Sequence, residues 1–378
     1  MLVFGQPIIE EAEIEEVVDS LRRRWIGTGP KVQRFERMLE SYCEVDHVRC
    51  LSSCTAALIL GLRVLDIGEG DEVLVPAMTF VASANAIQHS GATPVLVDSE
   101  PETGNIDLGA AEAAITPRTR AIMPVHLAGR PVDLDRLRAL ADRYGLEILE
   151  DAAHALGARW RDTQIGASGN LTAFSFYVTK NITTIEGGAL ATPDLAVAER
   201  VERLGLHGLS LGAWARFSDA GFNHYEAQEP GFKYNLTDVQ AALGLHQLPR
   251  LDAWIDARER IWDRYDELLA PLGVQTPAPA AQHTRHARHL YQVLIDPDGP
   301  TRDVVAQRMH DQMVGVGVHY RGVHLHPFYA QTYGLVPEDF PVASDISERT
   351  LSLPLSPALT EEEQDDVVAA LRTAIAGG

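Results

Sequence analysis

The chain contains few lysines, and one of them, Lys180, stands where it could do chemistry. Only Lys31, Lys180 and Lys233 are lysines among its 32 basic residues, and the rest are arginines. Lysine can lose its proton when it is desolvated and then attack a carbonyl carbon, whereas arginine stays protonated. Lys180 lies in the segment FSFYVTKN (174–181), which the turn EGG (186–188) follows. The segment indicates Schiff-base chemistry; a surface lysine retained by chance is the alternative.

A carboxylate, Asp151, follows a predicted strand in the segment EDAAH (150–154). If that strand ends at residue 149, Asp151 stands at its carboxyl edge, where ligands bind in open α/β sheets. A carboxylate in that place can pair with a positively charged ring nitrogen. The alternative is a helix N-cap, since aspartate before two alanines also caps well.

The segment LSSCTAAL (51–58) places small hydroxyl residues directly before a predicted helix. The first N–H groups of a helix are unpaired and lie at its positive dipole end, so they can bind a phosphate. An ordinary Ser/Thr cap explains the same pattern. Ser175, five residues before Lys180, adds a possible second phosphate donor.

Phe80 follows another predicted strand and could lie flat against a planar ring, although a lone aromatic is more often a core residue. Taken together, the sequence supplies an aldehyde-capturing lysine, a carboxylate, a phosphate-binding turn and a ring-stacking face. One cofactor uses all four, pyridoxal 5′-phosphate (PLP). The set of residues, and no single member, carries this hypothesis.

The elements that must position these residues alternate along the chain. We expect helices at residues 10–24, 32–42, 56–65, 81–89, 108–115 and 134–144. We expect strands at residues 72–75, 94–97, 121–125 and 147–149. Alternation of this kind predicts an α/β fold, with a mainly parallel sheet and helices on both of its faces.

Further along, the pattern changes. The polar segment 208–230 predicts a long functional loop. Helices are expected at 239–248 and 251–269, and the Pro/Ala-rich stretch 276–282 precedes a smaller unit. We therefore predict a large cofactor-binding domain over residues 1–250 and a small C-terminal α+β domain over residues 251–378.

Composition excludes several classes of partner. The net charge of −21 argues against nucleic acid and against an anionic membrane, because both favour a basic face. No apolar run reaches the ~18 residues that a membrane span needs, and the N-terminus lacks the pattern of a signal peptide. Cys43, Cys50 and Cys54 are odd in number and lack metal-ligand spacing. We expect reduced thiols, no metal and a cytoplasmic protein.

With these residues in hand, the chain resembles the DegT/StrS-type sugar aminotransferases, a branch of the fold-type I PLP enzymes. The resemblance covers nearly the whole chain and is specific as an array of motifs. These are GTGP (27–30), SCTAAL (53–58), GDEV (70–73), TFVA (79–82), VHLAG (125–129), EDAAH (150–154), the Lys180 segment, HGLS (207–210) and GFKYNLTD (231–238). Cys54 departs from the family pattern, in which glycine is common at this position.

The resemblance implies a role for each cofactor-binding residue. Lys180 would hold the cofactor as a Schiff base and shuttle the proton during transfer. Asp151 would keep the ring nitrogen protonated, Phe80 would stack on the ring, and His154 would lie near the phenolic oxygen. The phosphate would be held by Ser53, Cys54, Thr55 and Ser175, and by Asn235 of the neighbouring subunit. A homodimer with shared active sites is therefore implied.

The resemblance also implies the reaction. L-Glutamate would donate an amino group to C4 of a dTDP-4-keto-6-deoxyhexose, a nucleotide-linked keto sugar, in a ping-pong mechanism through pyridoxamine 5′-phosphate. Amination at C3, a keto-cyclitol substrate and a PLP-binding regulatory protein without turnover are the alternatives. Substrate contacts are expected from Thr28, Lys233, His319, Tyr320 and Arg321. The alternative for Lys233 is a structural role, and the alternative for Arg321 is an ordinary surface arginine. Gly322 departs from the family pattern, in which proline is more common at this position.

Overall fold

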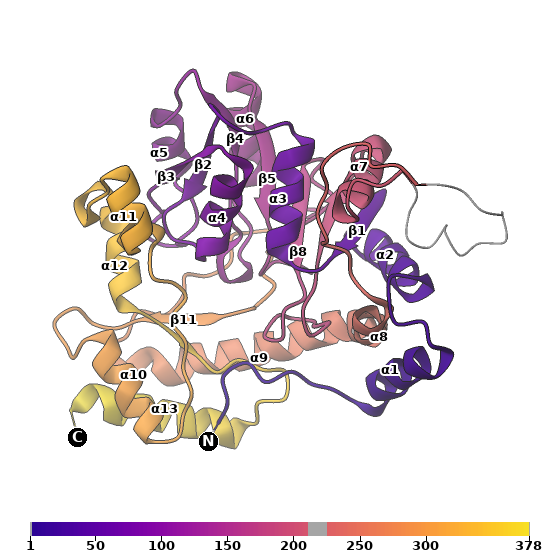
Figure 1. The fold of residues 1–378 in the computed structure, drawn as a ribbon. Helices are drawn as coiled ribbons and strands as arrows, with labels where there is room; N and C mark the ends of the chain where they lie inside the picture. The colour runs from indigo at the N-terminus through magenta and orange to yellow at the C-terminus, as the bar shows by residue number, and fades with distance from the viewer. Residues whose placement is uncertain (1, 211–224, 378) are drawn as a thin grey trace.

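The computed structural model describes residues 2–210 and 225–377, and a seven-stranded sheet forms its centre (Figure 1). The strand order is β1-β9-β8-β5-β4-β2-β3. Its strands are β1 (His47–Leu51), β2 (Glu72–Pro76), β3 (Thr93–Val97), β4 (Thr119–Ile122), β5 (Glu147–Asp151), β8 (Leu171–Ser175) and β9 (Gly188–Thr192). Neighbours pair in parallel, except that β9 runs antiparallel to both β8 and β1. The predicted α/β fold with a mainly parallel sheet is confirmed.

Both faces of this sheet are covered, which explains why its strands are almost continuously hydrophobic. Successive side chains of a strand point to opposite faces. Leu74 and Ile148 accordingly join one buried cluster, whereas Val73 and Leu149 join the other. The first cluster takes in α2 (Pro30–Cys43), α6 (Leu134–Tyr144) and α8 (Asp238–Gln247). The second takes in α3 (Cys54–Val64), α4 (Val81–Ser90) and α7 (Leu195–Gly205).

The helix α3 begins two residues earlier than the periodicity predicts. Ser53 is its N-cap, and the Ser53 hydroxyl accepts a hydrogen bond from the Ala56 N–H at 3.0 Å. Cys54 and Thr55 thus become the first residues of the helix. This shift brings their backbone N–H groups to the edge of the sheet where the predicted phosphate site lies.

The C-terminal part has a hydrophobic cluster of its own, built from α9 (Leu251–Leu269), α10 (Arg302–Asp311), α13 (Glu361–Ala376) and the antiparallel pair β11 (Tyr291–Leu294) and β12 (Thr350–Leu353). In Figure 1, α9 runs below the large sheet, and α10 and α13 lie below α9. The short strand β10 (Thr284–Arg285) pairs with β6 (Arg159–Trp160) of the preceding part. The domain boundary at residue 250 stays a prediction.

The remaining elements connect these layers. They include α1 (Glu11–Arg23), α5 (Leu108–Ala113), the short 3-10 helix η1 (Leu127–Gly129), β7 (Thr163–Gln164), α11 (Pro327–Tyr333) and α12 (Pro341–Arg349). Much of the loop predicted at 208–230 lies outside the described residues; where it is described, the Ser210 N–H donates to the Glu226 carbonyl. Within residues 2–210 and 225–377, no helix has the length and apolar character that a bilayer crossing requires.

Candidate active site

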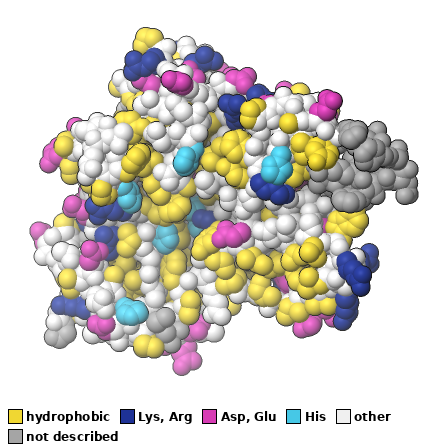
Figure 2. All heavy atoms as spheres, in the orientation of Figure 1, with side chains coloured by type: hydrophobic (Ala, Val, Ile, Leu, Met, Phe, Trp, Pro, Cys, Tyr) yellow, Lys and Arg dark blue, Asp and Glu magenta, His cyan; other side chains and the backbone are white. Residues whose placement is uncertain are grey.

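A cavity of about 400 Å³ opens where β5 and β8 end, and most of the predicted site residues line it. Ten of them do so: Ser53, Cys54, Thr55, Phe80, Asp151, His154, Ser175, Lys180, His319 and Tyr320. Four do not: Thr28, Lys233, Asn235 and Arg321. Figure 2 shows hydrophobic and histidine side chains gathered in the hollowed middle of one face of the molecule, with acidic side chains mostly farther out.

Lys180 stands on the turn that follows β8, where its N–H donates to the Tyr177 carbonyl at 2.9 Å. The side chain is partly buried and takes part in no ion pair within the described residues. Burial lowers the pKa of Lys180 to about 8, and the neighbouring Cys54 and Asp151 act in the opposite direction. A substantial fraction of the amine is therefore neutral near pH 8, as a nucleophile requires.

Asp151 is the last residue of β5 and is 5% exposed. Its Oδ2 accepts a hydrogen bond from Ser83 Oγ at 2.7 Å, and its Oδ1 accepts from the Ala153 N–H at 3.1 Å. Burial raises the pKa of Asp151, and the two hydrogen bonds and the charge of Lys180 offset this rise only in part. No helix begins at Asp151, so the helix-cap alternative is wrong.

The carboxylate of Asp151 is oriented by a short chain of hydroxyl groups that the sequence did not single out. Ser83 gives its only hydroxyl proton to Asp151, so Thr79 Oγ1, 2.9 Å from Ser83 Oγ, is the donor of that second bond. Thr79 and Ser83 are both buried. Ser83 follows Phe80 by three residues, about one helical turn, and this spacing is a sequence signal that both side chains lie on the same side of α4.

The start of α3 forms the predicted phosphate-binding edge. Cys54 and Thr55 line the cavity, and the first N–H groups of a helix have no partner within it. Gly188 makes this edge possible, because a Cβ at Gly188 would lie 2.3 Å from the Cys54 nitrogen. Ser175, at the end of β8, faces the same cavity. The arrangement suits an anion at the positive end of the α3 dipole.

Phe80 and Tyr320 form an aromatic wall. Phe80 precedes α4 and is 55% exposed, which is unusual for a large aromatic side chain. Its ring centroid lies 5.5 Å from that of Tyr320, at an angle of 41°. An exposed ring beside a cavity offers a surface on which a planar ligand can stack.

His154 holds the Tyr320 hydroxyl in place. The Ala128 N–H donates to His154 Nδ1 at 3.1 Å, so the neutral ring carries its proton on Nε2. That proton is donated to Tyr320 Oη at 2.8 Å, which leaves the hydroxyl proton of Tyr320 free to point into the cavity. Burial lowers the pKa of His154 well below its usual value, with Lys180 and His319 adding to the effect. Burial likewise raises the pKa of Tyr320, so the phenol stays a donor.

His289 also lines the cavity and was missed by the sequence reasoning. Its ring lies 4.5 Å from that of His154, and its Nδ1 is 3.1 Å from the side-chain oxygen of Asn181. Burial lowers the pKa of His289 well below its usual value. The segment RHARHLY (285–291) carries no periodic signal, and His289 reaches the site only because the C-terminal part packs against η1.

Thr28, Lys233 and Asn235 form a separate group behind the start of α3. Asn235 Nδ2 donates to Thr28 Oγ1 at 2.7 Å, and Lys233 Nζ donates to the Asn235 side-chain oxygen. Asn235 also pairs with Leu51 of β1. Arg321 is exposed and donates to the Leu325 carbonyl, outside the cavity. None of these four residues lines the cavity.

Comparison with known proteins agrees with this geometry. Residues 7–372 match the DegT/DnrJ/EryC1/StrS aminotransferase family. The spore coat polysaccharide biosynthesis protein SpsC of Bacillus subtilis (strain 168) is 44% identical over 380 residues, which cover 100% of this chain and 97% of SpsC.

Two solved structures are also similar to this chain. The putative sugar aminotransferase Spr1654 of Streptococcus pneumoniae, in its PMP form, superimposes with a TM-score of 0.92 at 36% identity over 99% of each chain. DesV of S. venezuelae, in complex with a ketimine intermediate, gives 0.86 at 38% identity over 95% of this chain and 93% of its own. The chain belongs to the DegT/DnrJ/EryC1/StrS aminotransferase family.

Proposed function

We propose that this family member is a PLP-dependent aminotransferase that moves the amino group of L-glutamate to a nucleotide-linked keto sugar. The substrate we favour is a dTDP-4-keto-6-deoxyhexose aminated at C4, with pyridoxamine 5′-phosphate between the two half-reactions. The sugar assignment is supported by the sugar aminotransferase Spr1654 and by the polysaccharide biosynthesis protein SpsC. We place the reaction in the cytoplasm, in keeping with three free, buried cysteines.

The observation that carries the proposal is a lysine with a lowered pKa and an under-compensated carboxylate on one cavity wall. The other two lysines are occupied elsewhere. Lys31 pairs with Glu16 at 2.7 Å and with Asp19 at 3.1 Å, and Lys233 donates to Asn235. Lys180 is thus the amine that this chain offers to an aldehyde.

The residues present fit PLP, which supplies an electrophilic aldehyde and an electron-withdrawing ring when it is bound. Asp151 would keep the ring nitrogen protonated, because an opposite charge in a desolvated site favours the charged form. The start of α3 and Ser175 would bind the phosphate. Phe80 would cover one ring face, and Lys180 Nζ can take up and return a proton.

The first half-reaction offers a direct test. Protein loaded with PLP is mixed with L-glutamate, and the absorbance band of the bound aldehyde form near ~420 nm is followed. We expect this band to be lost while 2-oxoglutarate appears in equal amount. Retention of the band would overturn the assignment of glutamate as donor, and Lys180→Ala serves as the unreactive control.

The second half-reaction identifies the acceptor. The protein that carries pyridoxamine 5′-phosphate is mixed in turn with dTDP- and UDP-linked 4-keto and 3-keto sugars and with a free keto-cyclitol. NMR of the product gives the position of the new amino group. Return of the ~420 nm band with a dTDP-4-keto sugar alone is the expected result. Return with the cyclitol alone would replace the sugar by the alternative substrate class.

We further propose that Asn235 completes the active site of a second subunit in a homodimer. Support comes from its place outside its own cavity and from the exposed apolar side chains Ile14, Leu21 and Ile26 nearby in the N-terminal segment. Mixing Lys180→Ala and Asn235→Ala subunits tests this, because a shared arrangement leaves one intact site in each mixed dimer. Rescued activity is expected. If each subunit used its own Asn235, no mixed dimer could be active.

A further inference from the structure

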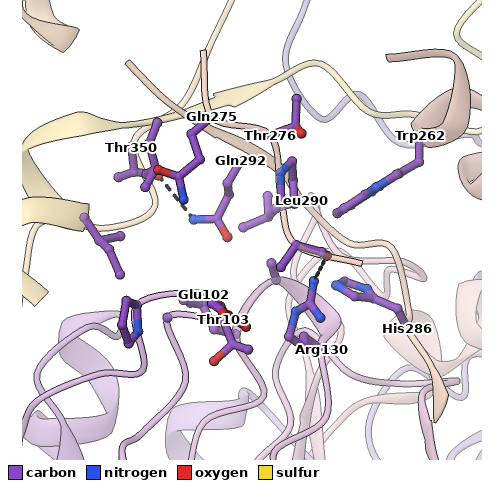
Figure 3. Close-up of a pocket in the computed structure, with 18 residues that line it drawn as sticks. Glu102, Thr103, Arg130, Trp262, Gln275, Thr276, His286, Leu290, Gln292 and Thr350 are labelled. Carbon is purple, nitrogen blue, oxygen red and sulfur yellow. Dashed lines mark hydrogen bonds between the residues drawn. The ribbon is translucent and has the colours of Figure 1, made fainter. Parts of the chain in front are cut away.

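A second cavity, of about 60 Å³, lies between η1 and the C-terminal part (Figure 3). Its walls come from the loop after β3, from η1 and Arg130, and from the C-terminal part, which contributes Trp262 of α9, His286 and Gln292. Space of this size accommodates roughly four water molecules or one ion of comparable volume. None of the predicted site residues lines it.

Arg130 gives this cavity a positive charge. The side chain is 8% exposed, and its guanidinium donates to the carbonyls of Ala278 and Pro279. It takes part in no ion pair within residues 2–210 and 225–377, whereas nearby Arg288 is paired with Glu259. Burial lowers the pKa of Arg130 to about 10, Arg288 adds to the effect, and Glu100 and Glu102 act in the opposite direction, so Arg130 stays charged at neutral pH. A buried charge with no carboxylate in direct contact is costly.

Two further N–H donors face the same space. The Arg288 N–H donates to His286 Nδ1 at 2.9 Å, so the neutral His286 ring carries its proton on Nε2. The His286 Nε2–H and the Trp262 indole N–H have no hydrogen-bond partner among the described residues. Both side chains are buried. Figure 3 shows the His286 ring beside the Arg130 guanidinium, with the Trp262 indole above them on the same side of the cavity.

We propose that this cavity binds a small oxyanion, a carboxylate or a phosphate group, held by Arg130, Trp262 and His286. A guanidinium with flanking N–H groups is the donor set that suits such an anion. Glu102 stands at the rim, exposed and beyond ion-pair distance of Arg130, so no carboxylate fills this place from within the described chain. The site goes beyond the proposed aminotransferase reaction and does not depend on it.

Two hydrogen bonds join residues that line this cavity to residues that line the active site, so we expect a bound anion to affect the active site. Ala128 lines the cavity and donates its N–H to His154 of the active site. On the other side, Gln292 lines the cavity and donates to the carbonyl of His319. Because both histidines line the PLP cavity, an anion that moves Ala128 or Gln292 changes the surroundings of the bound cofactor.

The experiment titrates PLP-loaded protein with acetate and, separately, with inorganic phosphate. Loading fills the phosphate edge of the active site beforehand. Tryptophan fluorescence should change in a saturable way, since the Trp262 indole touches the anion. Arg130→Gln should weaken binding at least about tenfold, because a hydrogen bond to a charged group is lost. Saturation by acetate alone or by phosphate alone identifies the anion class.

Control variants keep the test decisive. Arg143→Gln removes the same charge from the exposed end of α6, where Arg143 pairs with Glu112, and should bind as tightly as the parent. If Arg130→Gln does not fold, Trp262→Phe replaces it, with binding followed by the rise in Tm. The proposal fails if neither anion saturates the parent protein, or if the Arg130 and Trp262 variants bind with parental affinity. Binding without any shift of the ~420 nm band would overturn the coupling.

Discussion

Glu150 and Asp151 are neighbours at the end of β5, yet their carboxylates lie in two different environments. Successive side chains of a strand point to opposite faces, so Glu150 faces the α2 and α6 layer and Asp151 faces the α3 and α4 layer. Both are almost completely buried. What differs is how fully each negative charge is compensated by its surroundings.

The carboxylate of Glu150 is fully satisfied by hydrogen bonds from the fold. His126 Nε2 lies 2.8 Å from Oε2, while Ser168 Oγ and Asn170 Nδ2 both donate to Oε1. The Val132 N–H donates to His126 Nδ1, so the proton of the neutral ring points at Glu150. Burial raises the pKa of Glu150, but these hydrogen bonds outweigh it and the net shift is downward.

The negative charge of Asp151 is only partly compensated by its neighbours. Ser83 and Ala153 donate one hydrogen bond each, and the Cys54 thiol adds a weak one at 3.9 Å. The net shift of the pKa of Asp151 is upward because burial outweighs the hydrogen bonds that it accepts. A cation placed against this carboxylate would therefore be bound more strongly than one placed against Glu150. The fold thus compensates the charge of Glu150, whereas it leaves the charge of Asp151 only partly compensated, which suits a carboxylate that binds a cationic ligand.

Replacement of Asp151 should have the largest effect on function. In Asp151→Asn the negative charge opposite the ring nitrogen is lost, and kcat should fall on the order of 10²–10³-fold, as for other preorganised electrostatic groups. The cofactor-free variant should be no less stable than the parent, since an under-compensated charge has been removed. Single-turnover kinetics and thermal unfolding measure the two effects. A variant that is less stable than the parent but has parental kcat would show that Asp151 is structural, as Glu150 is.

Glu150→Gln should produce the opposite pattern. The variant keeps the shape of the side chain, but its amide N–H₂ faces one of the groups that donate to Glu150, so two buried donors oppose each other. This costs about 2–3 kcal/mol of unfolding free energy. Urea unfolding of the cofactor-free protein gives this number, with kcat changed far less than in Asp151→Asn. In the parent, the stabilisation from Glu150 is present above its usual pKa and is lost as the pH falls through the lowered folded value. In Glu150→Gln that acid-dependent loss should be missing.

Much of this site could be predicted from the sequence, because the residues that do chemistry follow regular strands. Asp151 ends the buried strand β5, Lys180 lies five residues after the end of β8, and the start of α3 carries its own cap signal. The period of two also places Glu150 and Asp151 on opposite faces. The sequence could not say which face holds the cofactor, since that depends on how the helices pack.

Other parts could not be predicted. Ser168 and Asn170 reach Glu150 across a loop, and His289 arrives from the C-terminal part, more than 100 residues from Lys180. No local pattern encodes such long-range packing. Likewise, Lys233 and Asn235 do not line the cavity, although the segment that carries them resembles a cofactor-binding motif.

The pH dependence of cofactor uptake gives a third, smaller effect. Only the neutral amine of Lys180 can attack the aldehyde, so the rate of PLP uptake by the cofactor-free protein should rise about tenfold per pH unit below the pKa and level off above about 8. In Asp151→Asn this midpoint should move to lower pH, because a negative neighbour is lost. Stopped-flow absorbance between pH 6 and 10 measures both curves. A midpoint near that of a free lysine would contradict the burial of the amine.

Two serines, one beside Asp151 and one beside Glu150, allow the two carboxylates to be compared with the smallest changes. Ser83→Ala removes a donor to Asp151, and Ser168→Ala removes one to Glu150. Each loses a charge-assisted hydrogen bond of about 1.5–3 kcal/mol at most. We expect Ser83→Ala to weaken PLP binding up to about tenfold, and Ser168→Ala to lower stability while PLP binding is unchanged. Identical effects in the two variants would mean that both sides of β5 are equally structural.

The most direct measurement uses the scarcity of lysine in this chain. PLP-loaded protein is reduced with borohydride, digested, and analysed by mass spectrometry for a pyridoxyl group. We expect the group on the peptide that contains Lys180, and none on Lys180→Ala. A group on Lys31 or Lys233, or an unmodified Lys180 in protein that holds PLP, would contradict it.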